Sequence, residues 1–427
     1  MRTVLALNAG SATLKFALYH AERLQLLARG LVDHWGADEQ DLVITGGSGE
    51  PLFDGQIPDT ENDAEAAIVF ILDWQNRQWP DAEVCVVGHR IVHGGADYRG
   101  PQRVTPEVMA RLEGFTSLAP LHQPAGLAGL RLAQHACPGV PQVASFDTAF
   151  HRTMSDTAAR IALPREYEAQ GIRRYGFHGL SYAYIASRVE TLDPALAKGR
   201  IIVAHLGSGA SLCALHESRS VDTTMSFSAL DGLVMGTRTG SIDPGVLLHL
   251  LDHGMSASQL SNLLYRRSGL LGVSGIAADM RTLLASDAQS ARDAIDLYVR
   301  RIVRETGALA ALLGGIDGLV FTAGVGENAP AIRTLVCKQL EWLGFSLDEG
   351  ANTQGGERRI SAAASKPVWV IPTDEEQVIA SEALKIRLPG ECPGPDTPIE
   401  RGGVKIDPRR RRGPGDKSQA SSNRAPP

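Results

Sequence analysis

Two stretches of the sequence share one design, and their recurrence constrains the fold more than any other feature. Residues 4–18 read VLALNAGSATLKFAL, an apolar run, a small hydroxyl-bearing turn and a second apolar run that contains Lys15. Residues 205–215 read HLGSGASLCAL and follow another apolar run, so the strand–turn–strand pattern returns. Because only four of the eleven aligned positions are identical, the inference depends on the shared design. The pattern predicts a duplicated domain whose hairpins face one cleft, with two unrelated hairpins as the alternative.

The chemistry of these turns suits a phosphate group. Glycine lets the backbone approach closely, N–H and hydroxyl groups donate hydrogen bonds, and Lys15 adds a positive charge. The sequence has neither a GxxxxGK[ST] loop nor a GxGxxG turn after its first strand. A nucleotide site in this chain would therefore be built from the hairpin turns.

Length and pattern indicate an α/β protein of two domains. A chain of 427 residues is too long for one core. Short apolar runs predict buried strands at Val84–Val87, Val143–Phe146 and Leu319–Thr322. A 3.6-residue periodicity around Ile295 and Ile302 predicts an amphipathic helix, and strands alternating with helices are typical of α/β folds.

Composition narrows the partners and the compartment. A net charge of −6 argues against non-specific binding of nucleic acid. The five cysteines are odd in number and show no CxxC spacing, which predicts reduced thiols in the cytoplasm and no structural zinc. We recognise neither a signal-peptide pattern nor an apolar run long enough for a membrane span.

The sequence after residue 388 differs from the rest. Residues 389–427 contain eight prolines, few apolar residues and the run Arg409–Arg412. This composition predicts a disordered basic tail. The basic run is either solvated and without a catalytic role or a contact for an anionic partner.

Several predicted strands end in glycine-rich turns that carry one or two polar groups, among them residues 88–95 and 324–328. Ligands of open α/β sheets bind at such strand ends. Arg90 has a planar fork that suits a carboxylate or phosphate, unless it forms a structural ion pair. Asp147 would hold an arginine or a metal-bound water, or cap a helix. His178, between two glycines, would donate to a developing anion, and Arg238 would clamp moving negative charge.

Three further glycine-rich or polar segments suggest a nucleotide pocket, and one acidic segment suggests a metal site. The pocket segments are 205–209, 279–281 and 324–328. The acidic segment is Asp374-Glu375-Glu376, which would hold Mg²⁺ through water, unless it is the solvated start of a helix.

Eight motifs together resemble the acetate kinase family. In order they are NAGSATLKF, GHRIVHGG, FDTAFH, RRYGFHGLSY, HLGSGASL, MGTRTGSIDPG, GVGEN and IPTDEE. The resemblance runs from Val4 to about Leu388, and eight ordered motifs make it specific.

The resemblance implies the duplicated actin-like ATPase fold of acetate and sugar kinases, Hsp70 and actin, with two domains flanking a nucleotide cleft. The expected domains are residues 1–150 with 376–388, residues 151–375, and the tail 389–427. It also implies a cytoplasmic homodimer that transfers a phosphoryl group between ATP and acetate, giving ADP and acetyl phosphate. The transfer would be direct and in line, with Mg²⁺ or Mn²⁺ as the metal.

By match of motif, the resemblance assigns roles to individual residues. The catalytic residues would be Asp147, His178 and Arg238. The acetate site would be formed by Arg90, Val92, Leu121, Phe177 and Ala229. The nucleotide site would be formed by Lys15, His205, Leu206, Gly207, Ser208, Gly209, Asp279, Met280, Arg281, Gly324, Val325, Gly326, Glu327 and Asn328. Asn8 and Glu375 would lie at the metal.

The chain departs from the family pattern at four places. Ala12 replaces a serine of the first turn, Ser208 replaces an asparagine, and Asp374 replaces an asparagine before the glutamates. Ala229 stands where the family has a proline that touches the acyl methyl group. Because alanine is smaller, we expect propionate to be accepted better than in a typical member. A propionate or short-chain acyl kinase, and an actin-like switch protein, are the alternative functions.

Overall fold

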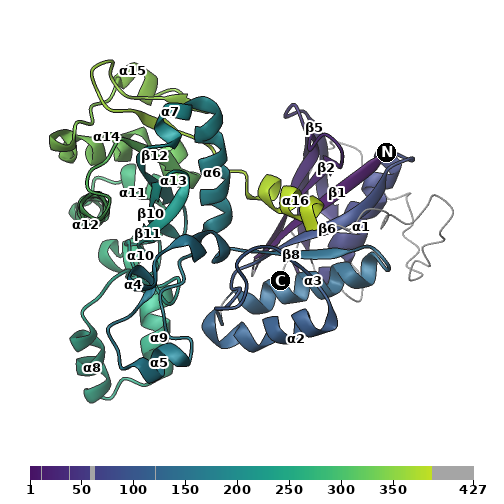
Figure 1. Ribbon diagram of the computed structural model, residues 1–427, viewed down its shortest axis with the longest axis horizontal. Coiled ribbons are helices and arrows are strands. Elements are labelled where there is room, and N and C mark those ends of the chain that lie inside the picture. Colours follow the sequence, from purple (N-terminus) through teal and green to yellow (C-terminus); the bar gives the residue numbers. More distant parts are fainter. Residues whose placement is uncertain (11, 38, 58–62, 121, 387–427) are drawn as a thin grey trace, which may run out of the picture.

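The computed structural model describes residues 1–10, 12–37, 39–57, 63–120 and 122–386. These residues form two lobes, each built around a mixed β-sheet with helices packed on it (Figure 1). The tail 387–427 and Leu121 lie outside the described residues. The prediction of a disordered tail therefore stays a prediction.

The first lobe contains an eight-stranded sheet in the order β5-β4-β3-β2-β1-β6-β8-β7. Its strands are β1 (Arg2–Ala9), β2 (Thr13–His20), β3 (Leu26–Asp33), β4 (Gln40–Gly46), β5 (Pro51–Ile57), β6 (Glu83–Ile91), β7 (Gln102–Arg103) and β8 (Gln142–Phe146). β1 to β5 form an antiparallel meander, whereas β6 and β8 continue from β1 in parallel.

The second lobe contains a six-stranded sheet in the order β11-β10-β9-β12-β14-β13. Its strands are β9 (Arg200–Leu206), β10 (Ala210–His216), β11 (Arg219–Thr223), β12 (Gly318–Thr322), β13 (Arg358–Arg359) and β14 (Val368–Val370). β9, β10 and β11 are antiparallel neighbours, and β12 and β14 follow β9 in parallel.

The two sheets share one topology, which confirms the predicted duplication. β3-β2-β1-β6-β8 in the first lobe corresponds to β11-β10-β9-β12-β14 in the second. In each copy the first hairpin pairs the end of one strand with the start of the next, with Asn8 opposite Lys15 and His205 opposite Ser211. The recurring sequence stretches are these two hairpins.

The helices cover both faces of each sheet. The first lobe has α1 (Asp63–Gln78), α2 (Pro106–Gly114), η1 (Phe115–Leu118) and α3 (Gln123–Ala136), and it is joined by α16 (Glu375–Ile386). The rest are η2 (Ala149–Thr153), α4 (Asp156–Ala159), α5 (Arg165–Ala169), α6 (Gly179–Leu192), α7 (Pro194–Ala197), α8 (Pro244–Asp252), α9 (Ala257–Arg266), α10 (Gly269–Ser274), α11 (Met280–Leu284), α12 (Gln289–Leu312), α13 (Ala323–Asn328), α14 (Pro330–Gln339), η3 (Glu341–Leu343) and α15 (Glu349–Asn352).

Strand β1 shows why the central strands have continuous apolar sequences. Leu5 and Leu7 join the core that includes residues of α1, while Val4 and Ala6 join the core formed with α16. Side chains of a strand point alternately to its two faces, and both faces are covered here. A strand buried on both sides needs apolar residues at every position.

Helix α16 returns the end of the described chain to the first lobe (Figure 1). Ile379, Ala380 and Ala383 pack in one core with Val4 and Ala6 of β1. The chain therefore crosses from β14 of the second sheet to the first lobe just before α16. The domain boundaries expected from the sequence stay a prediction.

Two sequence expectations need correction. The segment 88–91 was expected to be a turn, but it is the end of β6, because all four residues pair with β8 and residues 88–89 also pair with β1. The segment 324–328 was expected to be a turn after a strand, but it lies in the short helix α13. Among the helices within the described ranges, none has the length and apolar character needed to span a bilayer.

Candidate active site

Arg90 and Asp147 form the charged centre of the site. Arg90 comes from the end of β6 and Asp147 follows β8, so neighbouring parallel strands bring them together. The Arg90 Nε donates to Asp147 Oδ1 at 3.0 Å, and its Nη2 donates to Oδ2 at 2.6 Å. Asp147 is 1% exposed, whereas the Arg90 side chain is 22% exposed. Part of the Arg90 guanidinium is therefore accessible to a ligand, whereas the carboxylate of Asp147 is buried.

Asn8 connects this pair to the acidic start of α16. Its Nδ2 donates to Glu375 Oε2 and to Glu376 Oε1, each at 3.1 Å. Its Oδ1 accepts a hydrogen bond from Arg90 Nη1 at 3.2 Å. The two residues expected at a metal, Asn8 and Glu375, are therefore in direct contact.

Glu375 is held in an environment that disfavours its negative charge. Burial raises the pKa of this carboxyl from 4.5 to about 7, and the charges of Asp147 and Glu376 add to the effect, whereas Arg90 and Lys15 oppose it. The Glu375 side chain is only 14% exposed and lies among charged groups, so it is not the solvated helix start that was the alternative.

His178 projects from a strained turn. It precedes α6 with φ 58° and ψ 23°, in the left-handed region that non-glycine residues rarely occupy. Its Nδ1 lies 2.9 Å from Ser211 Oγ, and its Nε2 would lie 3.1 Å from a Cβ on Gly209. Burial lowers the pKa of His178 well below its usual value. The imidazole is thus neutral and fixed against the turn between β9 and β10.

His205 stacks on His178, with ring centroids 4.1 Å apart. Its Nδ1 lies 2.8 Å from Ser181 Oγ, which in turn is 2.9 Å from Thr373 Oγ1. Burial lowers the pKa of His205 to about 3, and the charges of Arg90 and Lys15 act in the same direction. Two neutral rings therefore line this wall.

Arg238, from the loop before α8, extends towards the His178 side of the site. Its Nη1 donates to the Ala229 carbonyl at 3.0 Å, and its Nη2 lies 3.1 Å from His122 Nε2. Burial lowers the pKa of His122 to about 4, and the charges of Arg238 and Arg90 add to that effect. Arg238 Nη1 also lies 3.8 Å from the Cβ position of Gly209, which lines the same cleft as Arg90, so the two arginines border one crevice.

A small apolar cavity lies beside Arg238. It encloses about 10 Å³, the space for one water-sized or methyl-sized group. Its walls are Val92, Leu118, Ala119, Pro120, His122, Phe177, Ser228, Ala229 and Tyr265. Three of the residues expected to touch the acyl group, Val92, Phe177 and Ala229, are therefore together. The fourth, Leu121, lies outside the described residues.

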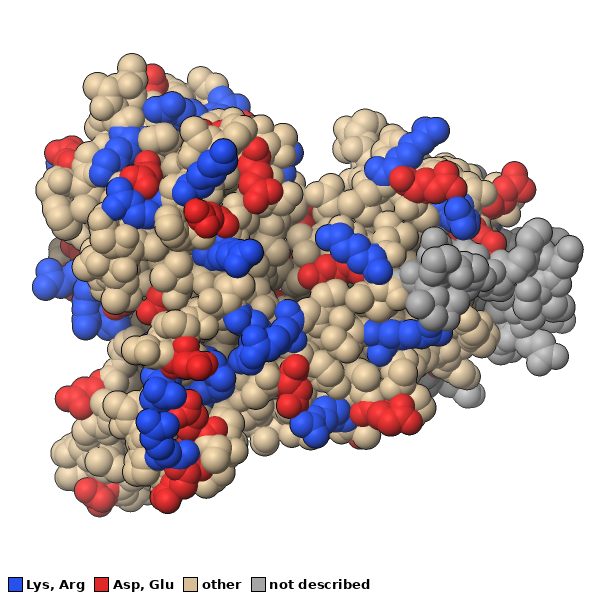
Figure 2. All heavy atoms as spheres, in the orientation of Figure 1, with Lys and Arg blue, Asp and Glu red and all other residues tan. Residues whose placement is uncertain are grey.

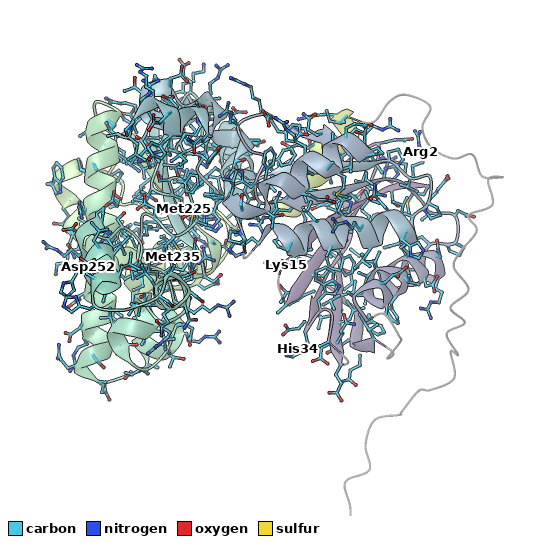
Figure 3. The ribbon with its side chains drawn as sticks, turned by 90° about the horizontal axis from the view of Figure 1, so that it is seen from below. Arg2, Lys15, His34, Met225, Met235 and Asp252 are labelled. Atoms are coloured by element: carbon cyan, nitrogen blue, oxygen red, sulfur yellow. The ribbon has the colours of Figure 1, made fainter. Side chains whose placement is uncertain are left out.

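A cleft of about 1490 Å³ contains most of the remaining expected residues. Figure 2 shows a notch between the lobes, and in Figure 3 Lys15 lies on the side of the first lobe that faces the second. The expected residues that line the cleft are Asn8, Lys15, Arg90, His178, His205, Gly207, Ser208, Gly209, Asp279, Met280, Arg281, Gly324, Val325, Glu327, Asn328 and Glu375.

Some expected residues do not line the cleft. Leu206 is fully buried in the core of the second lobe, and Gly326 is buried within α13. Asp279 does line it, but its carboxylate also accepts from Thr282 N at 2.8 Å and caps α11. A contact with a nucleotide would therefore have to share that oxygen or use the other one.

The aspartate at position 374 is explained by the neighbours of its carboxylate. Its Oδ2 accepts from Arg29 Nη2 at 2.6 Å, and its Oδ1 accepts from the Tyr19 hydroxyl at 3.1 Å. Its side chain is thus engaged with β2 and β3 of the first lobe. The carboxylate at this position is balanced by the Arg29 guanidinium.

Sequence reasoning missed two residues of this site. His122 was given no role, although it contacts Arg238. Its position next to Leu121, which was expected at the acyl group, is the signal that would have found it. Thr373, whose hydroxyl contacts Ser181 and whose N–H donates to Glu327 Oε1 at 3.1 Å, carried no signal of its own.

The oxygen donors present fit a Mg²⁺ ion held together with a substrate phosphate. Glu375 is a largely buried carboxyl beside Asp147 and Glu376, so a divalent cation nearby would favour its ionised form. Among the described residues no group of three or more His, Cys, Asp or Glu side chains forms a complete metal cage. Mg²⁺ at phosphate sites needs only one or two carboxylates, with water and phosphate as the other ligands.

Comparison with known proteins gives a consistent result. Residues 3–381 match the family described as the acetokinase family. An acetate kinase from Rhodopseudomonas palustris is 50% identical over 391 residues, covering 90% of this chain and 98% of that protein. The crystal structure of a propionate kinase from Francisella tularensis superposes with a TM-score of 0.83 at 34% identity, covering 91% of this chain and 100% of the other. That of Porphyromonas gingivalis acetate kinase superposes with a TM-score of 0.80 at 38% identity, covering 90% and 100%.

Proposed function

Because the chain belongs to the acetokinase family, we propose that it catalyses the reversible transfer of a phosphoryl group from ATP to acetate, giving acetyl phosphate and ADP. The observation that carries this proposal is the contact of Arg238 with His122 beside an apolar cavity of methyl size, with Arg90 on the adjoining cleft. A short carboxylate placed there would have its methyl group in the cavity and its charge beside a guanidinium.

The reaction requires two anions to meet. Acetate is already deprotonated, so no strong general base is needed, and the barrier lies in bringing its charge to the γ-phosphate. Arg90 would bind the acetate carboxylate, and Arg238 and His178 would donate hydrogen bonds to the phosphoryl oxygens. Asp147 orients Arg90 through its paired hydrogen bonds and does not need to take a proton.

The turn between β9 and β10 supports direct in-line transfer. The Cβ position of Gly209 lies 3.1 Å from His178 Nε2 and 3.8 Å from Arg238 Nη1. A side chain there would occupy the space between the two donors, so glycine leaves that space open. We propose that the transferred phosphoryl group passes through it.

The nucleotide would occupy the rest of the cleft. Lys15 and the segment His205–Gly209 would contact the phosphates, and the segments 279–281 and 324–328 would contact the nucleoside. Asn8 and Glu375 would hold Mg²⁺, or Mn²⁺, together with these phosphates. The ion would supply charge neutralisation for the β- and γ-phosphate oxygens.

Propionate is the alternative acyl substrate. The solved relative from Francisella tularensis is a propionate kinase, and Ala229 lines the acyl cavity of this chain. The cavity has room for about one methyl-sized group, which favours acetate. An additional methylene would require Ala229 or its neighbours to move.

Three further features are proposed on family grounds. We propose a homodimer, and the exposed apolar side chains of α8, Val246, Leu248 and Leu251, are a surface that a second copy would cover. We also propose a cytoplasmic location and domains comprising residues 1–150 with 376–388, and residues 151–375.

Trapping the product tests the proposed function. Purified protein is incubated with ATP, Mg²⁺, acetate and hydroxylamine, which converts an acyl phosphate to a coloured hydroxamate. We expect hydroxamate to form only when acetate and ATP are both present. Slow ATP hydrolysis without hydroxamate would refute the proposal and favour a nucleotide-dependent switch.

A further inference from the structure

His151 lies beneath the turn that carries two residues of the site. It belongs to η2 and is 1% exposed. Its Nε2 lies 2.9 Å from the Phe177 carbonyl oxygen, and its Nδ1 lies 2.8 Å from Ser220 Oγ. Because a carbonyl only accepts, Nε2 carries the proton and Nδ1 accepts from the Ser220 hydroxyl. Burial lowers the pKa of His151 to about 4, so the ring stays neutral at neutral pH.

The peptide group that His151 contacts joins Phe177 to His178. Phe177 lines the acyl cavity, and His178 stands in the left-handed region at φ 58°. That conformation costs on the order of 1–2 kcal/mol for a residue with a Cβ, so it persists only where its surroundings fix it. The hydrogen bond from His151 is one such constraint.

The ring of His151 also packs directly against Gly176. A Cβ on Gly176 would lie 2.5 Å from His151 Cδ2, and Gly176 itself has φ 76°. The imidazole therefore contacts the turn through its ring and through its Nε2–H. Within the described part of the chain, no other aromatic or imidazole ring donates a hydrogen bond to the Phe177 carbonyl oxygen.

We propose that His151 is a positioning residue for phosphoryl transfer, which holds the Phe177 carbonyl and thereby directs His178 Nε2 towards the turn at Gly209. The inference rests on the proposed function. It assigns to His151 no contact with substrate, and its effect on the reaction passes through His178.

A double-mutant cycle tests this coupling. His151→Phe keeps a buried ring but removes both ring nitrogens, and His178→Ala removes the group that His151 is proposed to direct. We expect His151→Phe to lower kcat at least tenfold in the wild-type background while the KM for ATP changes less than threefold. In the His178→Ala background, the same substitution should change kcat less than twofold. An equal loss in both backgrounds, or no loss in the first, would overturn the inference.

Two further variants distinguish a loss of positioning from a folding defect. His151→Gln retains an N–H donor and should recover most of the kcat that His151→Phe loses, whereas a loss as large as that of His151→Phe would contradict the role of the donor. His135→Phe, at a ring that is 74% exposed on α3, is the matched control and should leave kcat unchanged. Hydroxamate formation by the wild-type protein is scored first, so that failure of the proposed function is distinguished from failure of this inference.

Discussion

Arg90 donates two parallel hydrogen bonds to Asp147, from Nε to Oδ1 at 3.0 Å and from Nη2 to Oδ2 at 2.6 Å. The third nitrogen of the guanidinium, Nη1, donates to Asn8 instead. The fork is therefore fixed in orientation by two strands and by the residue that also contacts Glu375. A guanidinium held in this way is preorganised, so little reorientation is needed when an anion arrives.

Replacing Asp147 should damage both activity and stability. Asp147→Asn removes the charge beneath Arg90, and we expect kcat to fall on the order of 10²–10³-fold. Breaking one side of a buried ion pair also lowers the free energy of unfolding, by about 3–5 kcal/mol for fully buried pairs and less here because Arg90 is partly exposed. Steady-state kinetics and thermal melts measure the two effects.

The exposed pair between Arg111 and Asp97 provides the control. Arg111 also donates through Nε and Nη2, here both to Asp97 Oδ2, but the side chains are 60% and 41% exposed. Asp97→Asn should leave kcat unchanged and alter stability by less than about 1 kcal/mol. Equal effects of the two substitutions would show that burial of the Arg90 pair has no special role.

The raised pKa of Glu375 makes a prediction about pH. Its pKa is about 7 in the folded chain against an ordinary value of 4.5, so the folded state binds this proton more tightly than the unfolded state. The stability it contributes is fully present below pH 4.5 and is lost as the pH rises through 7. We expect the melting temperature of the nucleotide-free and metal-free protein to fall less across this range in Glu375→Gln than in the wild type.

Mg²⁺ should compete with that proton. Stabilisation of the wild-type protein by Mg²⁺ and ADP should be larger at pH 8 than at pH 6, and this difference should be small in Glu375→Gln. Identical pH profiles for the two proteins would mean that Glu375 does not titrate in this range.

Ala323 offers a test of backbone strain at the nucleotide cleft. It begins α13 with φ 65°, where a Cβ is unfavourable. Ala323→Gly should raise the free energy of unfolding by roughly 0.5–1 kcal/mol, measured by urea unfolding. Ala329→Gly is the control, because Ala329 has φ −116° and the same change there should lower stability. A loss of stability in Ala323→Gly would contradict the strain argument.

Ala229 should control acyl selectivity. One methylene in an apolar pocket is worth roughly 1–3 kcal/mol, so we expect kcat/KM for propionate to lie within about a hundredfold of that for acetate. Ala229→Val would reduce the cavity further and should lower kcat/KM for propionate more than for acetate. A wild-type preference for acetate well above a hundredfold would show that Ala229 confers no tolerance of the larger acyl group.

The sequence predicted the architecture because apolar runs and turns are local signals. The two hairpins, the buried strands and the α12 periodicity all follow from alternation and spacing within short windows. Where the prediction was wrong, long-range pairing determined the structure. Residues 88–91 form a strand because they pair with β8, and residues 88–89 also with β1, although the glycines of this segment favour a turn.

The residues of the site could be predicted from the sequence, but many of the contacts between them could not. The pairing of Arg90 with Asp147 was one of the alternatives, since both follow apolar runs that become neighbouring strands. The left-handed conformation of His178 and the contact of His122 with Arg238 depend on tertiary packing, which no short pattern encodes. The residue roles taken from the family remain predictions for the experiments above.

We propose that two arginines on one crevice let a short carboxylate meet a triphosphate, and single substitutions of either arginine test this claim most directly. Hydroxamate formation from ATP, Mg²⁺ and acetate is measured for the wild type, Arg90→Ala and Arg238→Ala, with melting temperatures to confirm folding. We predict that each variant loses on the order of 10²–10³-fold in rate while remaining folded. Near wild-type turnover in either variant would contradict the claim.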